Sequence, residues 1–415
     1  MVNKKEIFSL GENKQTDNYE IILDLGNQPW ANGFLSKSEC GKEPHYPLQL
    51  VYCHEPELLQ LSYFVPKEVM FKDHSYISGT TRTLMAHFYK LAEENSTQFN
   101  LDKENDIILD IGGNDGSQLE QYQKLGFNNV INFESADNIC KLSSDKGITT
   151  INNFFNEETV EKHLDRNSIK LINASGVFFH LEELDSVIKG INYCLRDDGI
   201  FVAQCMYVGA MVDNLNFDTI YHEHLCYYTL HSLTKLLKKY NLELEDAYFD
   251  KIHSGSIICK FRKSEFIHRI RRRTAITPRT FDLMEKDSKY TLESFRDFSK
   301  KIEENRFKLK ELLEDLVSRG KKIYGYGAPV KGNTLLNYMG IDNNLIQKIV
   351  EINPYKIGTY APGSYIPVIE ESEDDLPDYY LMLSHNFEDE ILEKNKELIK
   401  KGVKFILPFP IKIIE

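Results

Sequence analysis

From residue 106 to residue 207 the sequence alternates between short apolar runs and amphipathic helical segments such as GSQLEQYQKLG and LDSVIKGINYCL. The apolar runs are rich in β-branched residues, as buried strands are. Parallel strands need crossover helices, so this alternation predicts a mainly parallel sheet covered on both faces. The strands expected are 106–111, 129–135, 148–155, 169–177 and 199–207.

The flanking sequence predicts further elements. Residues 1–75 read as short extended pieces, and TRTLMAHFYKLAEE has the apolar spacing of a buried helix face. A helix over 230–241 and an antiparallel pair within 243–261 follow the alternation. A basic connector and a long helical stretch come next, and KKIYGYGAPVKGNTLLNYMG then begins a second strand–turn–helix unit. The fold class expected is therefore α/β, with two such modules joined by a helical arm.

Length and charge exclude several classes of partner. The chain has 415 residues, enough for two or three domains, and a formal net charge of −13. Coating nucleic acid or an anionic membrane needs concentrated Lys and Arg, so we expect a small-molecule substrate instead. No run approaches the roughly 20 apolar residues of a membrane span, and the N-terminus lacks a signal-peptide core, which favours a cytoplasmic protein. The seven scattered cysteines are expected to be free thiols, mostly buried.

A glycine-rich turn, ILDIGGNDGSQL, joins the first strand of the alternation to its helix. Glycines such as Gly112 let the backbone approach a ligand, and the helix N-terminus offers free N–H groups. Asp110, Asn114 and Asp115 depart from a dinucleotide-binding loop, because acids repel a pyrophosphate and suit a cationic ligand. Glu134, at the end of the second strand, is placed to bind ribose hydroxyls. The alternative is an ordinary strand–helix turn with a favourable helix cap.

This turn and its distant acid together resemble the S-adenosylmethionine site of Rossmann-like methyltransferases. The resemblance implies that Asn153 and Phe154, after the third strand, lie beside the adenine. It places Asn173 and Ser175, after the fourth strand, near the methionine part. S-Adenosyl-L-methionine is therefore the expected cofactor.

The segment DTIYHEHLCYY, residues 218–228, concentrates groups that can move a proton. Near neutral pH a histidine with suitable neighbours is the usual general base. Glu223 can orient an adjacent imidazole, Tyr221 can donate to a developing oxyanion, and His180 should face the same crevice. His222 and His224 would point to opposite sides of a strand, which disfavours a metal chelate from this segment alone. A structural polar cluster is the alternative to catalysis.

Nearly end to end, the chain resembles the sugar-nucleotide C-methyltransferases, which methylate C-3' of 4-keto-deoxysugars attached to a nucleoside diphosphate. The resemblance rests on FDTIYHEHLCYYTL, DIGGNDGSQL, IHSGSI and YGYGAPVKGNTLLNYMG, with LDLGNQPWANGFL near the start and KFILPFP near the end. It implies a small N-terminal module that usually binds zinc, a central Rossmann-like methyltransferase domain, and a C-terminal Rossmann-like domain without a dinucleotide. The regions expected are 1–75, 76–262, 263–320 (connector and helical arm) and 321–415.

The same resemblance implies roles for particular residues. His224 becomes the general base, with Tyr221, Glu223 and His180 around the reacting sugar. The glycines and the lysine of GYGAPVKGN suit phosphates, although close strand–helix packing also explains glycines in such a turn. The residues expected to bind the nucleotide sugar are Tyr76, Ser78, His253, Ser256, Gly325, Gly327, Lys331 and Asn333.

Two departures from the family pattern affect the expected chemistry. The zinc module of the family has two Cys-x-x-Cys pairs, whereas this chain has no cysteine before Cys40 and has Pro56 where the partner of Cys53 belongs. Four-coordinate zinc needs its ligands, so we expect no metal. The acceptor-lining stretches NASGVFFH and AQCMY also differ from the family pattern.

The changed acceptor stretches leave three functions open. The first is C-methylation at C-3' of a nucleotide-linked 4-keto-deoxysugar. The second is O-methylation of a nucleotide-activated hexose or heptose in polysaccharide biosynthesis, since a histidine base serves either reaction. The third is a non-catalytic binding relic, which the intact cofactor turn and YHEH segment disfavour. The resemblance is compatible with a monomer.

Overall fold

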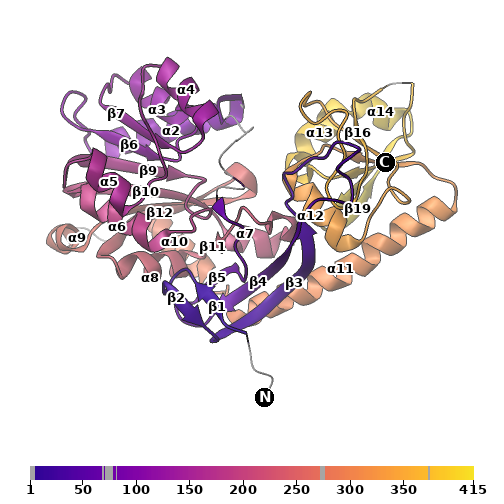
Figure 1. Cartoon of the computed structure of the whole chain (residues 1–415), viewed down its shortest axis with the longest axis horizontal. Helices are drawn as coiled ribbons and strands as arrows, with labels where there is room; N and C mark the ends of the chain where they lie inside the picture. The colour runs from indigo at the N-terminus through magenta and orange to yellow at the C-terminus, as the bar shows by residue number, and fades with distance from the viewer. Residues whose placement is uncertain (1–4, 68–69, 71–77, 81, 272–275, 373) are drawn as a thin grey trace.

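The computed structural model describes residues 5–67, 70, 78–80, 82–271, 276–372 and 374–415. Its larger sheets are a four-stranded N-terminal sheet, a seven-stranded central sheet and a six-stranded C-terminal sheet. Figure 1 shows the central and C-terminal sheets on opposite sides of the molecule, with the indigo N-terminal strands between them and the long helix α11 (Leu292–Ser318) running beneath the C-terminal part. The predicted α/β class, with a small N-terminal module and two Rossmann-like parts, is confirmed.

The N-terminal sheet includes one strand, β11, that comes from the middle of the chain. Strands β3 (Tyr19–Pro29), β4 (His45–Cys53) and β5 (Leu58–Leu61) are antiparallel, and β11 (Cys226–Tyr227) pairs with β5. The N–H of Leu61 also donates to the carbonyl of Leu225 over 2.9 Å. The stretch that follows YHEH is thereby fixed on the N-terminal module. A separate hairpin is formed by β1 (Ile7–Ser9) and β2 (Lys14–Thr16).

The central sheet has the strand order β12-β13-β10-β9-β6-β7-β8. The five strands from β10 to β8 are parallel, as the alternation predicts, and β13 runs antiparallel to both β10 and β12. The strands are β6 (Ile108–Ile111), β7 (Val130–Glu134), β8 (Thr149–Asn152), β9 (Ile169–Ser175), β10 (Leu195–Met206), β12 (Leu242–Asp250) and β13 (Ser256–Lys263).

Successive residues of these strands belong to different hydrophobic clusters on the two faces of the sheet. Ile108 and Leu171 pack with one cluster, and their neighbours Leu109 and Ile172 with the other, because side chains alternate along a strand. Helices α2 (Arg82–Gln98) and α3 (Ser117–Lys124) cover the first face, and α5 (Glu157–His163), α6 (Leu184–Cys194) and α8 (Leu230–Lys238) the second. Helix α4 (Asp137–Asp145) contacts β7 and β8, and α7 (Val208–Asp213) follows β10.

The C-terminal sheet has the order β16-β15-β14-β17-β18-β19, parallel except for β19. Its helices are α12 (Val330–Met339), α13 (Glu388–Lys394) and α14 (Lys396–Lys400). Its strands are β14 (Ile323–Tyr326), β15 (Lys348–Val350), β16 (Val368–Ile369), β17 (Tyr379–Met382), β18 (Lys404–Pro408) and β19 (Ile411–Ile414).

The connector between the two large sheets differs from its prediction. Helix α9 (Ser264–Arg271) occupies the start of the stretch expected to be a solvated linker. The expected single helical stretch is divided into α10 (Pro278–Asp287) and α11, because Thr277 and Thr291 each cap a new helix N-terminus. Gly320, with a φ of 76°, follows α11 as predicted.

One hydrophobic cluster runs through every part of the molecule. It includes Leu50 of the N-terminal sheet, Phe178 beside the central sheet, Ile302 of α11 and Leu335 of α12. All seven cysteines are free thiols, six of them buried and Cys40 partly exposed. In the described part of the chain no helix has the length and apolar character that crossing a lipid bilayer requires.

Candidate functional site

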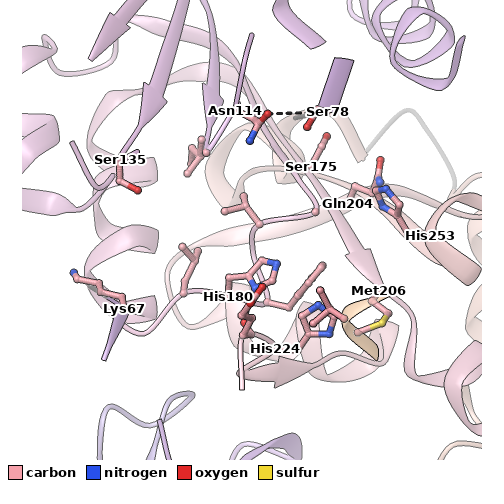
Figure 2. Close-up of a pocket in the computed structure, with 18 of the residues that line it drawn as sticks. Lys67, Ser78, Asn114, Ser135, Ser175, His180, Gln204, Met206, His224 and His253 are labelled. Atoms are coloured by element: carbon pink, nitrogen blue, oxygen red, sulfur yellow. Dashed lines mark hydrogen bonds between the residues drawn. The ribbon is translucent and has the colours of Figure 1, made fainter. Parts of the chain in front are cut away.

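A cavity of about 540 Å³ opens at the carboxyl ends of β6, β7, β9 and β10, the edge where ligands gather in open parallel sheets. Asn32 of the N-terminal module and 329–331 at the start of α12 complete its wall. The sequence-predicted residues that line it are Ser78, Gly112, Asn114, Glu134, Asn153, Phe154, Ser175, His180, Tyr221, Glu223, His224, His253, Ser256 and Lys331 (Figure 2).

Other predicted residues lie elsewhere. Tyr76 falls outside the described residues. The amide of Asn333 is buried and donates to the carbonyl of Ala31 over 2.7 Å, so this side chain joins α12 to the N-terminal module. The described residues that the prediction assigned to the site but that do not line the cavity are Asp110, Asp115, Asn173, Gly325, Gly327 and Asn333.

Contacts with Glu134, Ser78 and Asn132 hold the cofactor turn in shape. Asn114 has a φ of 52°, and its N–H donates to Oε2 of Glu134 over 3.0 Å. Its side-chain oxygen accepts from the N–H of Ser78 over 3.0 Å, as Figure 2 shows. At Gly113 a Cβ would come within 2.4 Å of Oδ1 of Asn132, so only glycine permits this close approach. The turn therefore presents Glu134 at the cavity.

The two aspartates of this turn face the protein interior. Burial, together with the nearby carboxylate of Glu134, raises the pKa of Asp110 well above its usual value. Asp115 accepts from the hydroxyl of Ser117 over 2.8 Å and pairs with the ammonium of Lys146 at 2.9 Å. Glu134 is therefore the acid of this group that lines the cavity.

The cavity wall fits S-adenosylmethionine. Oγ of Ser175 and Nε2 of Gln204 are buried, and neither has a hydrogen-bond partner among the described residues. Such groups are costly unless a ligand or water satisfies them. Glu134 would hold the ribose hydroxyls, and the ring of Phe154, with the ammonium of Lys67 at 4.4 Å from its centroid, would flank the adenine.

His224 is the histidine best placed to act as a base. Its Nδ1 lies 2.7 Å from the carbonyl oxygen of Thr219. A carbonyl can only accept, so Nδ1 carries the proton and Nε2 keeps its lone pair. Burial lowers the pKa of His224 well below 6.5, and the neighbouring His180 and His253 lower it further, against the opposing effect of the Thr219 carbonyl. The imidazole is thus neutral at neutral pH.

His180 and Tyr221 flank this imidazole. The ring centroid of His224 lies 3.9 Å from that of Tyr221 and 5.0 Å from that of His180. Nδ1 of His180 donates to the backbone carbonyl of Glu223, which leaves Nε2 of His180 with a lone pair when the ring is neutral. Figure 2 shows the two histidines side by side in the cavity.

The YHEH segment forms a turn rather than the strand assumed in its prediction. The N–H of His224 donates to the carbonyl of Tyr221 over 2.9 Å, just after the short helix η2 (Phe217–Thr219). The two histidines still diverge as expected. His222 is buried edge-on against Tyr46 of β4, with ring centroids 5.7 Å apart, while His224 lines the cavity.

A buried cluster of charges joins η2 to the C-terminal domain beside the cavity. Asp218 is fully buried, and its Oδ2 lies 2.7 Å from Nε2 of His385 and 3.8 Å from Nζ of Lys331. Burial lowers the pKa of Lys331, against the opposing charge of Asp218. The lysine expected to meet phosphates thus already has a carboxylate neighbour.

Several residues that line the cavity were not assigned to the site individually from the sequence: Lys67, Asn32, Gln204 and Met206. Gln204 and Met206 belong to the AQCMY stretch, which is expected to line the acceptor, and Asn32 belongs to LDLGNQPWANGFL, which carries part of the family resemblance. Gln204, at the end of a parallel strand, could have been assigned individually, because ligands gather at such ends.

Known protein families match all three parts of the chain. Three family models match in order: a "Putative zinc binding domain" over 11–71, a methyltransferase domain over 84–247 and a C-methyltransferase C-terminal domain over 251–410. The C-methyltransferase NovU of Streptomyces niveus is 30% identical over 401 residues, which cover 95% of this chain and 94% of that protein.

Solved structures match somewhat less than half of the chain. The PH0226 protein of Pyrococcus horikoshii OT3 is 12% identical with a TM-score of 0.36, covering 48% of this chain and 100% of its own. An S-adenosylmethionine-dependent methyltransferase of Clostridium acetobutylicum is 13% identical with a TM-score of 0.36, covering 43% of this chain and 92% of its own.

The N-terminal module does not fit the zinc that its domain description mentions. Cys53 is buried beside Ile7, Tyr19 and Val51, and burial raises the pKa of its thiol to about 12, whereas zinc needs thiolates. Within the described residues, His, Cys, Asp and Glu form no group of three or more suited to a metal ion. That no zinc binds stays a prediction.

Proposed function

Because the chain belongs to the S-adenosylmethionine-dependent C-methyltransferase family, we propose that it methylates C-3' of a nucleoside-diphosphate-linked 4-keto-deoxysugar. His224 is the general base in this proposal. The observation that carries it is the hydrogen bond from Nδ1 of His224 to the Thr219 carbonyl, because it leaves a neutral Nε2 in the cavity wall. A base in this state can take a proton at neutral pH.

The proposed reaction begins with the acceptor. A 4-keto group acidifies the hydrogen at C-3', and Nε2 of His224 removes that proton. The electron pair of the broken C–H bond moves into an enolate, whose oxygen needs a hydrogen-bond donor. Bound S-adenosylmethionine would supply an electrophilic methyl group: C-3' would form its new bond to the methyl carbon as the bond from that carbon to sulfur breaks, and S-adenosylhomocysteine would leave.

Tyr221 is the better of two candidates for stabilising the enolate oxygen. When the ring of His180 is neutral, its one N–H is engaged with the Glu223 carbonyl and no second N–H remains to donate. The Tyr221 hydroxyl belongs to a cavity-lining residue whose ring contacts His224. We assign Tyr221 as the donor and His180 as a neighbour that packs against the ring of the base.

The ten-residue helix α12 supports a phosphate-bearing acceptor. Its first residues, Val330 and Lys331, line the cavity together with Pro329. Free N–H groups at a helix N-terminus bind phosphate. The diphosphate of a nucleotide sugar is therefore placed at this end of the cavity in our proposal, with the sugar toward His224.

The test is incubation of the purified protein with methyl-labelled S-adenosylmethionine and a panel of nucleotide sugars, both 4-keto and reduced. NMR of the product is expected to show the labelled methyl on C-3' of a keto sugar. A methyl on oxygen, or transfer to reduced sugars, would contradict the proposal. Absence of S-adenosylmethionine binding by calorimetry would indicate a relic.

A further inference from the structure

Trp30 is the single tryptophan of the chain, and it reaches the site from the N-terminal module. It follows strand β3, and its indole Nε1–H donates to Oε1 of Glu223 over 2.8 Å, across 193 positions in the sequence. Glu223 is 6% exposed and lines the cavity. We propose that Trp30 is a positioning residue for methyl transfer, acting through Glu223. This inference rests on the proposed function.

The loop that carries the indole is held from two sides. The N–H of Gly33 closes a turn on the carbonyl of Trp30 over 3.0 Å, and a Cβ at Gly33 would lie 3.3 Å from the indole ring. The buried amide of Asn333 on α12 donates to the next carbonyl, that of Ala31, over 2.7 Å. The indole therefore approaches Glu223 from a fixed loop, which reduces the entropy lost in making the contact.

The indole holds one oxygen of the Glu223 side chain. An indole N–H can only donate, so Oε1 of Glu223 accepts. The backbone carbonyl of Glu223 also accepts from Nδ1 of His180, whose ring lies 5.0 Å from that of His224. A displaced Glu223 would therefore disturb the tautomer of His180 as well as the cavity wall.

Glu223 then has a defined task in the acceptor site. The side chain of Glu223 lines the cavity, where one of its oxygens accepts a hydrogen bond from a hydroxyl of the acceptor. With the indole in place, the carboxylate cannot rotate freely between orientations. Trp30 thus selects a hydroxylated acceptor and fixes its position relative to His224, although it does not itself touch the reacting atoms.

A double-mutant cycle of Trp30→Phe and Glu223→Ala tests the inference. Trp30→Phe keeps an aromatic ring and removes the N–H; kcat/KM for the acceptor should fall about 10- to 100-fold, the usual effect of losing a bond to a charged group. Affinity for S-adenosylmethionine should be unchanged. Glu223→Ala removes the oxygen that accepts from the indole, so in that background Trp30→Phe should cost less than about twofold. If the two losses in kcat/KM simply multiply, the inference is overturned.

Tyr19→Phe is the matched control for this cycle. It removes one hydrogen bond within the same module, from the Tyr19 hydroxyl to the carbonyl of Lys5 at 2.9 Å, and Tyr19 does not line the cavity. Its kcat/KM should stay within about twofold of the parent protein, as expected for a change away from the site. If Tyr19→Phe lost as much kcat/KM as Trp30→Phe, the effect of Trp30→Phe would come from a general loosening of the N-terminal module.

Fluorescence gives a readout that needs no acceptor. Trp30 is the only tryptophan, so its emission reports this contact directly. A negative charge beside the indole nitrogen stabilises the excited state, so Glu223→Gln should shift the emission to shorter wavelength, whereas Glu57→Gln should not. Unchanged emission in Glu223→Gln would overturn the inference. A shifted emission in a protein that methylates no nucleotide sugar would instead contradict the proposed function and leave the contact standing.

Discussion

Backbone carbonyls, rather than carboxylates, set the proton positions of the paired histidines in the cavity. The Thr219 carbonyl accepts from His224, and the Glu223 carbonyl accepts from His180. Glu223 is expected from the sequence to orient the base, whereas in the structure the Thr219 carbonyl does so and the Glu223 carboxyl group contacts Trp30. A backbone carbonyl only accepts, so in its neutral form each of the two histidines carries its proton on Nδ1.

Replacing Tyr221 tests which group stabilises the enolate. Tyr221→Phe removes the hydroxyl donor, and turnover should fall about 100- to 1,000-fold, the usual cost of one oxyanion donor. Steady-state kinetics should place this loss in kcat. Tyr227→Phe is the control, because this neighbour is buried and does not line the cavity. Normal turnover in Tyr221→Phe would remove Tyr221 from the role.

The buried histidines also make stability depend on pH. Burial lowers the pKa of His222 from 6.5 to about 4. Between these two pH values the unfolded chain binds a proton that the folded chain does not. The free energy of unfolding should therefore fall as the pH is lowered through this window, by about 3 kcal/mol from His222 alone.

Urea unfolding of the parent protein and His222→Phe at pH 7 and pH 5 measures this effect. The variant should lose less stability than the parent between the two pH values, because the phenylalanine ring does not titrate. The part that remains should include His224 and His253, because burial lowers the pKa of both in the same direction. Equal losses in both proteins would show that His222 does not carry the dependence.

The two Rossmann-like parts use the same device at the end of a second strand. Oε2 of Glu134, the last residue of β7, accepts from the N–H of Asn114 over 3.0 Å. Oε2 of Glu351, just after β15, accepts from the N–H of Ala328 over 2.7 Å. In each case an acid one strand away shapes the glycine-containing turn. Glu134 therefore shapes the cofactor turn, in addition to its proposed contact with the ribose hydroxyls.

Glu134→Gln tests the binding part. The amide keeps one oxygen for the N–H of Asn114 but loses the charge that holds ribose hydroxyls. The dissociation constant of S-adenosylmethionine, measured by calorimetry, should rise about tenfold or more. Turnover should recover at saturating cofactor. Unchanged affinity would show that the carboxylate only shapes the turn.

Elements with a local sequence pattern were predictable. The strands β6 to β10 contain short stretches rich in apolar and β-branched residues, and the cofactor turn contains its own glycines. Helix α9 was missed because its charged residues resemble a solvated linker. The contact of Trp30 with Glu223, and that of Asp218 with His385, join residues 193 and 167 positions apart. No local pattern encodes such pairs, since they arise only when separate modules pack together.

The three modules of the molecule meet at the cavity. Strand β11, which follows the YHEH segment, completes the N-terminal sheet, and Lys331 and His385 of the C-terminal domain contact Asp218 of η2. A single hydrophobic cluster passes through all of these parts. We therefore expect the modules to unfold together rather than independently.

The N-terminal module should stay folded without zinc. The side chain of Gln60 ties this module together by accepting from the N–H of Leu10 over 2.9 Å and donating to the carbonyl of Phe8 over 2.8 Å. Metal analysis of the purified protein should find well under one zinc per chain, and a chelator should leave the melting temperature unchanged. One tightly bound zinc, with a chelator-induced loss of stability, would contradict this prediction.

The central claim is that His224 removes the proton at C-3' of a keto sugar. Its most direct test is NMR of a nucleotide-linked 4-keto-deoxysugar incubated in D₂O with the protein and S-adenosylhomocysteine, so that no methyl is transferred. The parent protein should exchange the C-3' hydrogen for deuterium, and His224→Ala should do so about 100- to 10,000-fold more slowly, the usual contribution of a general base. Equal exchange by the two proteins, or C-methylation by His224→Ala at the parent rate, would contradict the claim.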